Sequence, residues 1–151
     1  MRFLPGQEVE IASKEEGFIG SYYKATIVTY IQNEFYLVQY RELLKEDESG
    51  PLREVIRGED IRPTPPAKLL PTASAGFAML DRVDALYNDG WWTGRITGRE
   101  GSTYVVHFEN SGERLAFSDS DLRMHLEWVN GNWIATTRRR ILLPQKQNID
   151  S

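Results

Sequence analysis

The sequence predicts an all-β fold built from two small antiparallel β-barrels in tandem. Three observations support this prediction: the chain repeats itself in four blocks, apolar residues alternate within the blocks, and Gly-, Asn-, Asp- and Pro-rich segments separate them. Alternation with a period of two is typical of strands that bury one face. Short alternating strands bounded by turn residues are typical of small barrels.

The four blocks keep their order in both copies, and apolar positions mostly match apolar positions. The matched segments are 7–11 with 81–85, 22–27 with 91–96, 36–40 with 104–108, and 53–62 with 114–123. Chance similarity rarely preserves order, spacing and polarity together, so we expect each copy to form one barrel of about five strands. The connection before the fourth block is long in the first copy and short in the second, which a hairpin tip tolerates.

The first block shows the alternation clearly. Val9 and Ile11 alternate with Glu8 and Glu10. This pattern predicts a strand that buries the two apolar side chains and turns the two carboxylates outward. The remaining blocks alternate in a similar way.

Proline and composition divide the chain into segments. The residues from Pro63 to Pro66 remove ladder donors and hold the backbone extended, which indicates a linker. The expected division is domain 1 at 3–64, a linker at 65–76, domain 2 at 77–137 with a C-terminal hairpin, and a flexible basic tail at 138–151.

The C-terminal hairpin is predicted from Asn130 and Gly131, which lie between two aromatic-bearing runs. Asn-Gly is the strongest short-range hairpin signal because both residues accept a positive φ. Trp128 and Trp133 are then expected to face each other across the hairpin, as packing residues rather than ligand-binding ones.

Composition excludes several classes of protein. There is no cysteine and there are two histidines, so a disulfide framework, a thiolate metal site and a zinc site are not expected. No apolar stretch approaches the roughly 20 residues that span a membrane, and no signal-peptide segment is present, so an intracellular protein without membrane contact is expected. The formal charge of −4 argues against a protein that binds nucleic acid over its whole surface. No catalytic motif or cofactor motif is found, so no enzymatic activity and no cofactor are predicted.

Several segments resemble the plant Agenet domain. They are 8–11, 16–27 and 60–63 in the first copy, and 83–94 and 122–128 in the second. The paired arrangement and the Gly90-Trp91-Trp92 element carry most of the likeness, which covers roughly residues 3 to 136. The first copy has Tyr22 where the family often has Trp.

The resemblance implies a tandem pair of Tudor-like barrels of the Royal group, which are chromatin-associated binding modules. Several such modules recognise methyl-lysine on histone tails, and the tandem Agenet proteins in particular recognise histone H3 methylated at lysine 9. The expected partner is therefore a histone H3 tail, the expected location is the nucleus and its heterochromatin, and the chain is expected to be a monomeric tandem unit within a longer protein.

A methyl-lysine site needs aromatic rings around a bulky cation, each contributing about 0.5–2 kcal/mol, together with a carboxylate. The candidate cage residues are Phe18, Tyr22, Tyr40, Tyr87, Trp91, Trp92 and Phe108. The candidate acidic contacts to the tail are Glu15, Glu16, Asp84, Asp89 and Glu109.

Strand parity separates some of these rings. Tyr23 and Trp92 share the parity of buried neighbours, which favours a core role, whereas Tyr22 and Trp91 have the opposite parity and favour binding, because exposed rings without a partner are unusual. Three further rings fit either role: Tyr40, Tyr87 and Phe108.

The leading hypothesis is a non-enzymatic reader of the histone H3 tail with methylated lysine 9, best matched by the dimethylated form. Two alternatives remain: an interaction scaffold that binds unmodified peptides, and a nucleic-acid-binding Tudor-like module. The run Arg138–Arg140 is a candidate weak DNA contact, and the alternative is that it simply begins a disordered segment.

Overall fold

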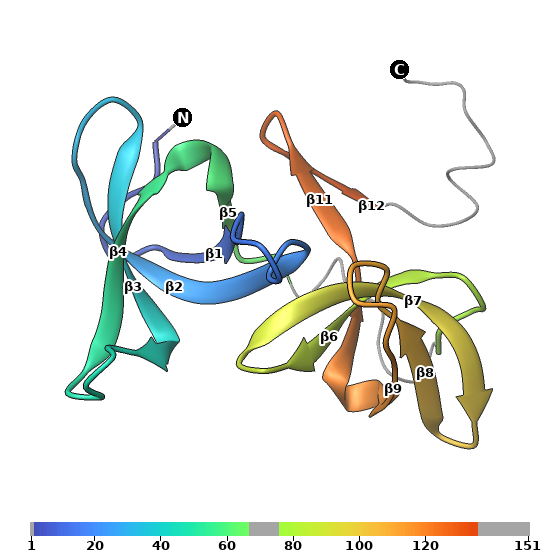
Figure 1. The fold of residues 1–151 in the computed structure, drawn as a ribbon. Helices are drawn as coiled ribbons and strands as arrows, with labels where there is room; N and C mark the ends of the chain where they lie inside the picture. The colour runs from blue at the N-terminus through green and yellow to red at the C-terminus, as the bar shows by residue number, and fades with distance from the viewer. Residues whose placement is uncertain (1, 67–75, 136–151) are drawn as a thin grey trace. The chain divides into compact units, whose positions relative to one another are not determined.

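The structure is a computed structural model that describes residues 2–66 and 76–135 (Figure 1). The chain divides into two compact units: Met1–Thr64 with Leu86–Trp92 form unit 1, and Pro65–Ala85 with Thr93–Ser151 form unit 2. Regular structure in the described residues is β-strand and short 3-10 helix, which confirms the all-β prediction. No helix in these ranges is long and apolar enough to cross a membrane. The predicted basic tail lies outside the described residues, and so does most of the predicted linker.

Unit 1 contains five antiparallel strands. They are β1 (Glu8–Ala12), β2 (Ser21–Tyr30), β3 (Phe35–Leu44), β4 (Pro51–Arg57) and β5 (Ile61–Pro63), with a 3-10 turn η1 (Gly58–Asp60) before β5. Pairing runs in the order β5-β1-β2-β3-β4 (Figure 1). β3 continues to Leu44 and pairs there with Pro51, so part of the long charged connection is strand rather than loop.

Unit 2 repeats this order with β10-β6-β7-β8-β9. Its strands are β6 (Arg82–Tyr87), β7 (Gly90–Glu100), β8 (Thr103–His107), β9 (Arg114–Ser118) and β10 (Leu122–Met124), with η4 (Asp119–Asp121) before β10. The end of β6 and the start of β7, within Leu86–Trp92, are grouped with unit 1. The two units thus confirm the duplication predicted from the four sequence blocks.

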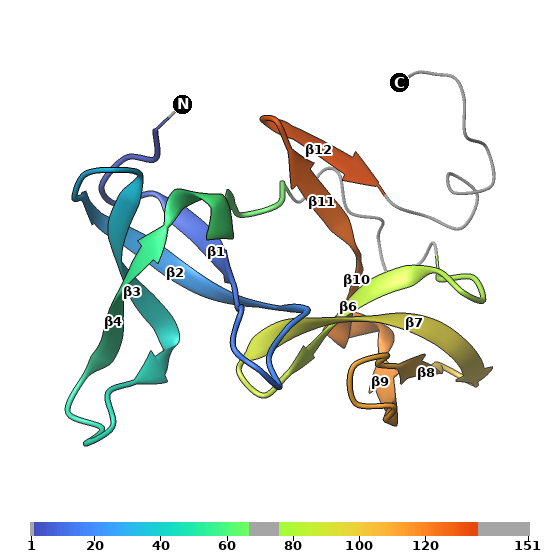
Figure 2. The same cartoon turned by 45° about the horizontal axis from the view of Figure 1, so that its top comes forward.

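Beyond the barrel strands, unit 2 carries the hairpin of β11 (Leu126–Val129) and β12 (Asn132–Ala135), a separate ribbon in Figure 2. Asn130 and Gly131 both have positive φ, as the Asn-Gly turn requires. Trp128 pairs with Trp133, and their ring centroids are 4.9 Å apart. The prediction for this hairpin is confirmed.

The alternation rule is wrong at one position in each copy. Val9 and Ile11 are buried as expected, but Glu10 between them is also fully buried, and so is its counterpart Asp84. Both carboxylates are buried because each contacts a buried arginine on the neighbouring strand. The opposite charge of the arginine offsets the cost of removing the carboxylate from water.

The first of these ion pairs lies in unit 1. Arg62 on β5 donates to Oε1 of Glu10 through Nη2 at 2.7 Å and through Nε at 3.1 Å. The guanidinium also lies over the ring of Tyr22, 3.7 Å from its centroid. One face of Tyr22 is therefore covered by a cation of the chain itself.

The second ion pair belongs to a larger network in unit 2. Arg123 Nε donates to Asp84 Oδ2 at 3.0 Å, and Thr93 Oγ1 donates to Asp84 Oδ1 at 2.8 Å. His125 lies between two carboxylates, with Nδ1 2.8 Å from Asp84 Oδ1 and Nε2 in a short contact with Glu127. Burial opposes the protonated form of His125, but the hydrogen bonds and charges of the two carboxylates outweigh it and raise its pKa.

Candidate functional site

A cavity of unit 1 has a volume of about 660 Å³ and combines aromatic, acidic and apolar walls. Its rings are Phe18, Tyr23 and Tyr40, its carboxylates are Glu15, Glu54 and Asp60, and its aliphatic walls include Ile11, Leu43, Leu52, Val55 and Ile56. The β1–β2 connection, β3, β4 and η1 all contribute, so residues far apart in sequence meet at this one place. We call it the unit 1 cavity.

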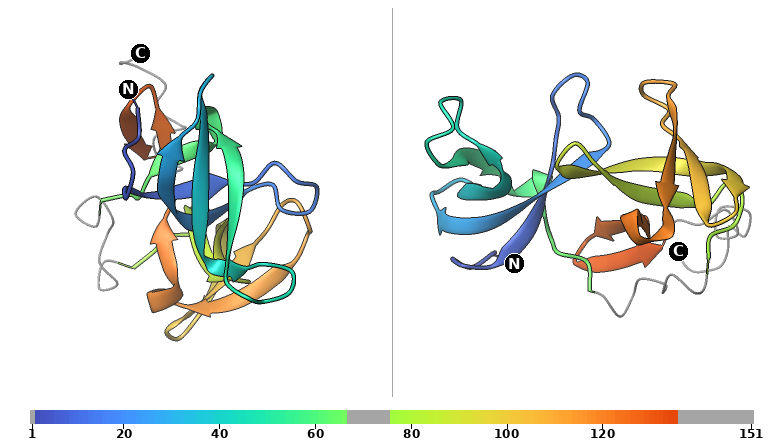
Figure 3. Two further views of the ribbon diagram at one scale, coloured as in Figure 1. Left: turned by 90° about the vertical axis from the view of Figure 1, so that its left-hand side faces the viewer. Right: turned by 90° about the horizontal axis from the view of Figure 1, so that it is seen from below.

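The β1–β2 connection positions Phe18 at the edge of the unit 1 cavity. Gly17 and Gly20 adopt φ of 87° and 90°, which a side chain would disfavour, and they make the turns on either side of Phe18. The backbone nitrogen of Phe18 donates to the carbonyl of Glu15, and the nitrogen of Ser21 donates to the carbonyl of Phe18. Figure 3 shows this connection projecting beyond the strands of its barrel. The Phe18 ring remains 42% exposed, so it is available to a ligand.

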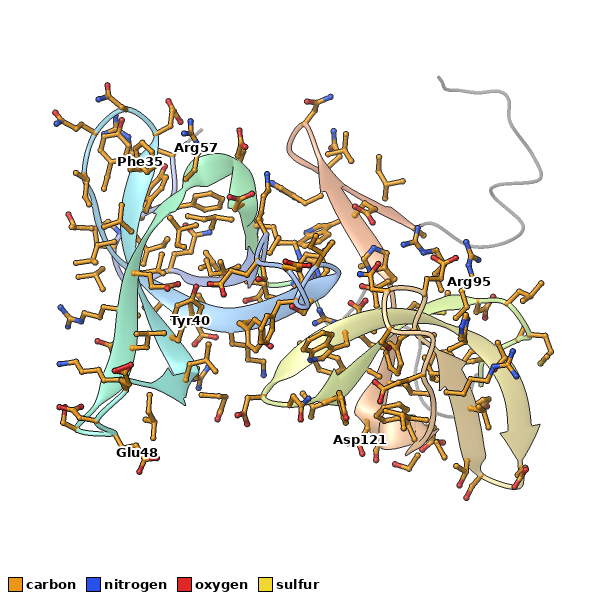
Figure 4. All side chains as sticks on the ribbon, viewed as in Figure 1. Phe35, Tyr40, Glu48, Arg57, Arg95 and Asp121 are labelled. Carbon is orange, nitrogen blue, oxygen red and sulfur yellow. The ribbon has the colours of Figure 1, made fainter. Side chains whose placement is uncertain are left out.

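Tyr40 and Glu54 form the polar part of the unit 1 cavity. The Tyr40 hydroxyl donates to Oε1 of Glu54 at 2.7 Å (the position of Tyr40 is labelled in Figure 4). Burial and the hydrogen bond to Glu54 raise the pKa of Tyr40, which keeps the phenol protonated and acting as the donor. The Glu54 carboxylate is thereby fixed beside two rings.

A second group of rings surrounds Trp92, which belongs to unit 1 with the rest of Leu86–Trp92. The Trp92 centroid lies 5.8 Å from Phe18, 6.4 Å from Tyr23 and 6.3 Å from Tyr87. A Cβ on Gly90 would lie 2.7 Å from the Tyr23 ring, so this close approach requires glycine. Trp92 therefore packs against Phe18 and Tyr23, and it does not itself line the unit 1 cavity.

Lys14 lies at the rim of the unit 1 cavity. Its Nζ is 3.0 Å from Asp60 Oδ1 and 3.4 Å from Glu59 Oε2. The hydrogen bond and charge of Asp60, and then those of Glu59, raise the pKa of Lys14. Because Lys14 is 66% exposed, water screens this contact and a cationic ligand can compete with it.

A smaller cavity of about 340 Å³ also lies in unit 1, lined by Tyr87, Trp91, Asp89 and Glu42, together with Lys24. Three of the predicted site residues, Tyr87, Asp89 and Trp91, meet here. The structure thus brings the predicted rings and acids to two cavities rather than one.

The remaining predicted residues lie elsewhere. Tyr22 is stacked on Arg62, Phe108 is buried in unit 2 at 6.0 Å from Phe117, and Asp84 is buried in its ion pair. Glu16 and Glu109 are exposed and line neither of the two cavities.

Sequence reasoning missed Glu54 and Asp60 and assigned Tyr23 to the core. Tyr23 is indeed buried, yet its ring also lines the cavity. The signal for Glu54 was present in β4, where it shares the half-buried face with Leu52 and Ile56. A carboxylate at an apolar position of a strand calls for a partner, and Tyr40 is that partner.

Unit 2 lacks the acidic and phenolic groups at the matching positions. The repeat aligns Tyr40 with Phe108 and Glu54 with Leu115. Phe108 packs edge-on against Phe117 instead of donating to a carboxylate. Unit 1 therefore carries a hydroxyl and a carboxylate that unit 2 lacks at these positions.

The described residues hold no cluster of three or more His, Asp or Glu side chains suited to one metal ion. Asp84, His125 and Glu127 do not converge on a common point, because the two carboxylates contact different ring nitrogens of His125. Hydrogen bonds and ion pairs account for these groups.

Comparison with known proteins identifies one family and several relatives. The Agenet domain family matches residues 6–66 and 80–138. The chain is 40% identical over 135 residues to the Arabidopsis thaliana protein Agenet domain (AGD)-containing P1, and 36% identical over 133 residues to DUF724 domain-containing protein 3 of the same plant. These alignments cover 89% and 83% of the chain but 26% and 19% of the relatives, so the chain spans about a quarter or less of their length.

Two solved structures of Agenet domain proteins are similar to this chain over most of their length. The crystal structure of Arabidopsis thaliana AGDP1 AGD34 matches with a TM-score of 0.78 and 36% identity, covering 87% of this chain and 88% of the other. The structure of ADCP1 tandem Agenet domain 3-4 matches with a TM-score of 0.76 and 33% identity, covering 87% and 86%. These matches agree with two small Tudor-like barrels.

Proposed function

Since the chain belongs to the Agenet domain family, as a tandem pair, we propose that it is a non-catalytic chromatin reader that binds a methylated lysine of the histone H3 tail in the unit 1 cavity. The observation that carries this proposal is the Tyr40–Glu54 hydrogen bond beside the rings of Phe18 and Tyr23. Such a site offers both ring faces and a fixed carboxylate to a cation.

The chemistry favours a dimethylated lysine. Methyl groups weaken the hydration of the ammonium and spread its charge, so aromatic faces replace water at little cost, each contributing about 0.5–2 kcal/mol. A dimethylammonium keeps one N–H, and Glu54 can accept it, whereas a trimethylammonium has none to donate. Dimethylated lysine 9 of histone H3 is the ligand we propose.

The size and charge of unit 1 fit a peptide rather than an isolated side chain. At about 660 Å³ the unit 1 cavity exceeds one methylated ammonium group, and its aliphatic walls can take a neighbouring small side chain. In the smaller cavity, Asp89 and Glu42 can attract a further basic side chain of the same tail. Two engaged cavities would fix the direction of the peptide.

Titration of the whole chain with H3 peptides that differ only at lysine 9 tests the proposal. We expect micromolar affinity for the dimethylated peptide, and affinity at least about tenfold weaker for the unmodified one, a difference of about 1.4 kcal/mol. Equal affinity for all forms would favour the interaction scaffold. Peptides dimethylated at lysine 4 or lysine 27 test the choice of lysine 9.

Two substitutions and a control locate the site. Phe18→Ala should weaken binding of the dimethylated peptide, and Glu54→Gln should reduce the preference for dimethyl over trimethyl. Ile31→Ala removes a comparably exposed apolar side chain (45%) outside both cavities and should leave affinity unchanged. If Phe18→Ala and Ile31→Ala behave alike, the unit 1 cavity is not the site.

Because a chromatin reader acts in the nucleus, we propose a nuclear location for the protein that contains this chain. A fluorescent fusion of the full-length protein that contains this chain should concentrate in the nucleus, over heterochromatin. Exclusion from the nucleus in every cell type tested would contradict the proposal.

A further inference from the structure

A row of basic side chains crosses the outer face of unit 2. Arg95 on β7 pairs with His107 on β8, and His107 pairs with Arg114 on β9. Residues in register on neighbouring antiparallel strands point to the same face. The three side chains therefore form one line across three strands, with Arg95 labelled in Figure 4.

Arg82 on β6 extends the line to a fourth strand. The Ile96 nitrogen donates to the Asp81 carbonyl at 3.0 Å, as the Ile27 nitrogen does to the Gln7 carbonyl in unit 1. That bond in unit 1 accompanies the pairing of the next residue, Glu8, with Thr26. By the same register, Arg82 lies beside Arg95. We call Arg82, Arg95, His107 and Arg114 the basic row.

The first repeat has no net positive charge at the matching positions. There, Glu8 pairs with Thr26, Thr26 with Gln39, and Gln39 with Arg53. The Arg53 Nε donates to Gln39 Oε1 at 2.9 Å, and Glu8 pairs with Arg41 at 3.4 Å. One glutamate and one arginine cancel in that row, whereas three arginines without an acid give the basic row a formal charge of +3.

The side chains of the basic row make no ion pair in the described part of the chain. Arg95 donates through Nη1 to the Leu80 carbonyl at 3.1 Å, which holds the side chain in place and leaves its charge uncompensated. Arg114 is exposed, and the other three are partly exposed.

We propose that the basic row binds the phosphate backbone of duplex DNA. Strands lie about 4.8 Å apart, so a row across four strands is about 14 Å long. A DNA duplex carries one negative charge per about 1.7 Å of its axis, so a straight row of arginines can contact several phosphates at once. Arginine also forms paired hydrogen bonds with phosphate oxygens.

The surroundings of the basic row favour a duplex over a single strand. On one side of the basic row, the next row on this face consists of Gly98, Val105 and Ala116, which are small or aliphatic, and on the other side lie Thr93 and Asp84. Proteins that bind single strands stack bases on aromatic side chains, and this row offers none. Contact through phosphates alone fits the regular backbone of a duplex and implies little sequence preference.

Salt dependence gives the first test, with the whole chain and a short fluorescent duplex of mixed sequence. With three phosphates neutralised, affinity should fall roughly 40-fold between about 50 and 200 mM salt. Binding that is insensitive to salt, or tighter binding to single-stranded DNA or RNA of the same length, would overturn the assignment to duplex DNA.

A matched pair of variants locates the contact. Arg114→Thr removes an arginine from the basic row, and Arg53→Thr removes its counterpart in the first repeat. We expect Arg114→Thr to weaken duplex binding several-fold and to lower the salt slope by about 1, with no effect of Arg53→Thr. Arg95→Thr should act in the same direction, with its unfolding temperature measured in parallel. Equal effects of Arg114→Thr and Arg53→Thr would contradict the proposal.

Two further variants separate this surface from other sources of binding. Replacing Arg138, Arg139 and Arg140 by threonine should leave most of the duplex affinity, and complete loss there with none in Arg114→Thr would place the contact in the tail. Phe18→Ala should spare duplex binding, and Arg114→Thr should spare H3 peptide binding. The two functions can therefore fail independently.

Discussion

The two repeats share their strand order but use it differently. In unit 1, Tyr40 and Glu54 make a polar cavity among rings, whereas the matching Phe108 and Leu115 of unit 2 are apolar. The outer faces of the two units also differ. The charges on this face of unit 1 compensate one another, whereas unit 2 carries the basic row. Both copies keep the same strand order, and a few side chains at equivalent positions give each copy its own surface chemistry.

The buried ion pair is common to both copies, but its environment is not. Glu10 accepts hydrogen bonds from Arg62, and Asp84 contacts Arg123, His125 and Thr93. Burial opposes the charge on Asp84, but the hydrogen bond from His125 and the charges of His125 and Arg123 outweigh it and lower its pKa. Substitutions at these paired positions should show how far the copies have diverged.

The largest difference is expected from removing each buried carboxylate. Glu10→Ala removes the carboxylate that contacts the buried Arg62 and should lower the free energy of unfolding by about 3–5 kcal/mol. Asp84→Ala removes a carboxylate that contacts Arg123, His125 and Thr93, so its effect should be larger. Urea unfolding followed by circular dichroism gives both values. A smaller loss for Asp84→Ala would mean that Glu127 alone suffices for this network.

Gly94 and Ala25 occupy equivalent positions in β7 and β2. A Cβ at Gly94 would lie 2.6 Å from the Val106 Cγ1 and 2.8 Å from the His107 carbonyl oxygen. Gly94→Ala should therefore destabilise unit 2 by about 1–3 kcal/mol through overpacking. Ala25→Gly should cost roughly 0.5–1 kcal/mol, mainly through backbone entropy. Thermal unfolding of both variants measures the difference, and a neutral Gly94→Ala would show that the strands can separate to admit the methyl group.

The Tyr40–Glu54 pair of unit 1 can be tested by giving Tyr40 and its counterpart Phe108 in unit 2 each other's side chain. Tyr40→Phe removes the hydrogen bond to Glu54 and should lower stability by about 1 kcal/mol. It should also weaken binding of the dimethylated H3 peptide, because Glu54 is no longer held in place. The reverse change, Phe108→Tyr, should leave peptide affinity unchanged. Calorimetric titration checks both, and an effect of Phe108→Tyr equal to that of Tyr40→Phe would contradict the assignment of the site to unit 1.

The smallest expected effect is the pH dependence that His125 gives to unit 2. Its folded pKa is raised above the ordinary value of 6.5, so its stabilising contribution is complete below that value and is lost as pH rises through the raised pKa. Asp84 acts in the opposite direction, because its pKa is lowered and its contribution disappears only in acid. As pH rises above about 6.5, the unfolding temperature of the wild type should therefore drop more than that of His125→Gln. Parallel curves for the two proteins would exclude the histidine as the cause.

The fold was predictable because its determinants are local and repeated. Alternating residues, the four blocks and the Asn130-Gly131 turn each specify a strand or a hairpin from neighbours in sequence. The buried carboxylates were not predicted, since Glu10 becomes acceptable inside only when Arg62, 52 residues away, supplies the opposite charge.

The lining of the unit 1 cavity was predictable only in outline. Phe18, Tyr40 and Glu15 were named from their place in the repeat, and they do line the unit 1 cavity. Strand parity favoured a binding role for Tyr22. Parity indicates only the face of the strand on which a side chain lies, and the guanidinium of Arg62 covers one face of the Tyr22 ring. Glu54 was missed because its significance depends on the hydroxyl of Tyr40 on the neighbouring strand.

The grouping of Leu86–Trp92 with unit 1 bears on how such pairs can evolve. Trp92 is encoded in the second repeat, yet it packs on Phe18 and Tyr23 of the first. A recombination event that moved the first repeat alone into another gene would leave that tryptophan behind. The ring cluster around Trp92 therefore depends on residues from both repeats.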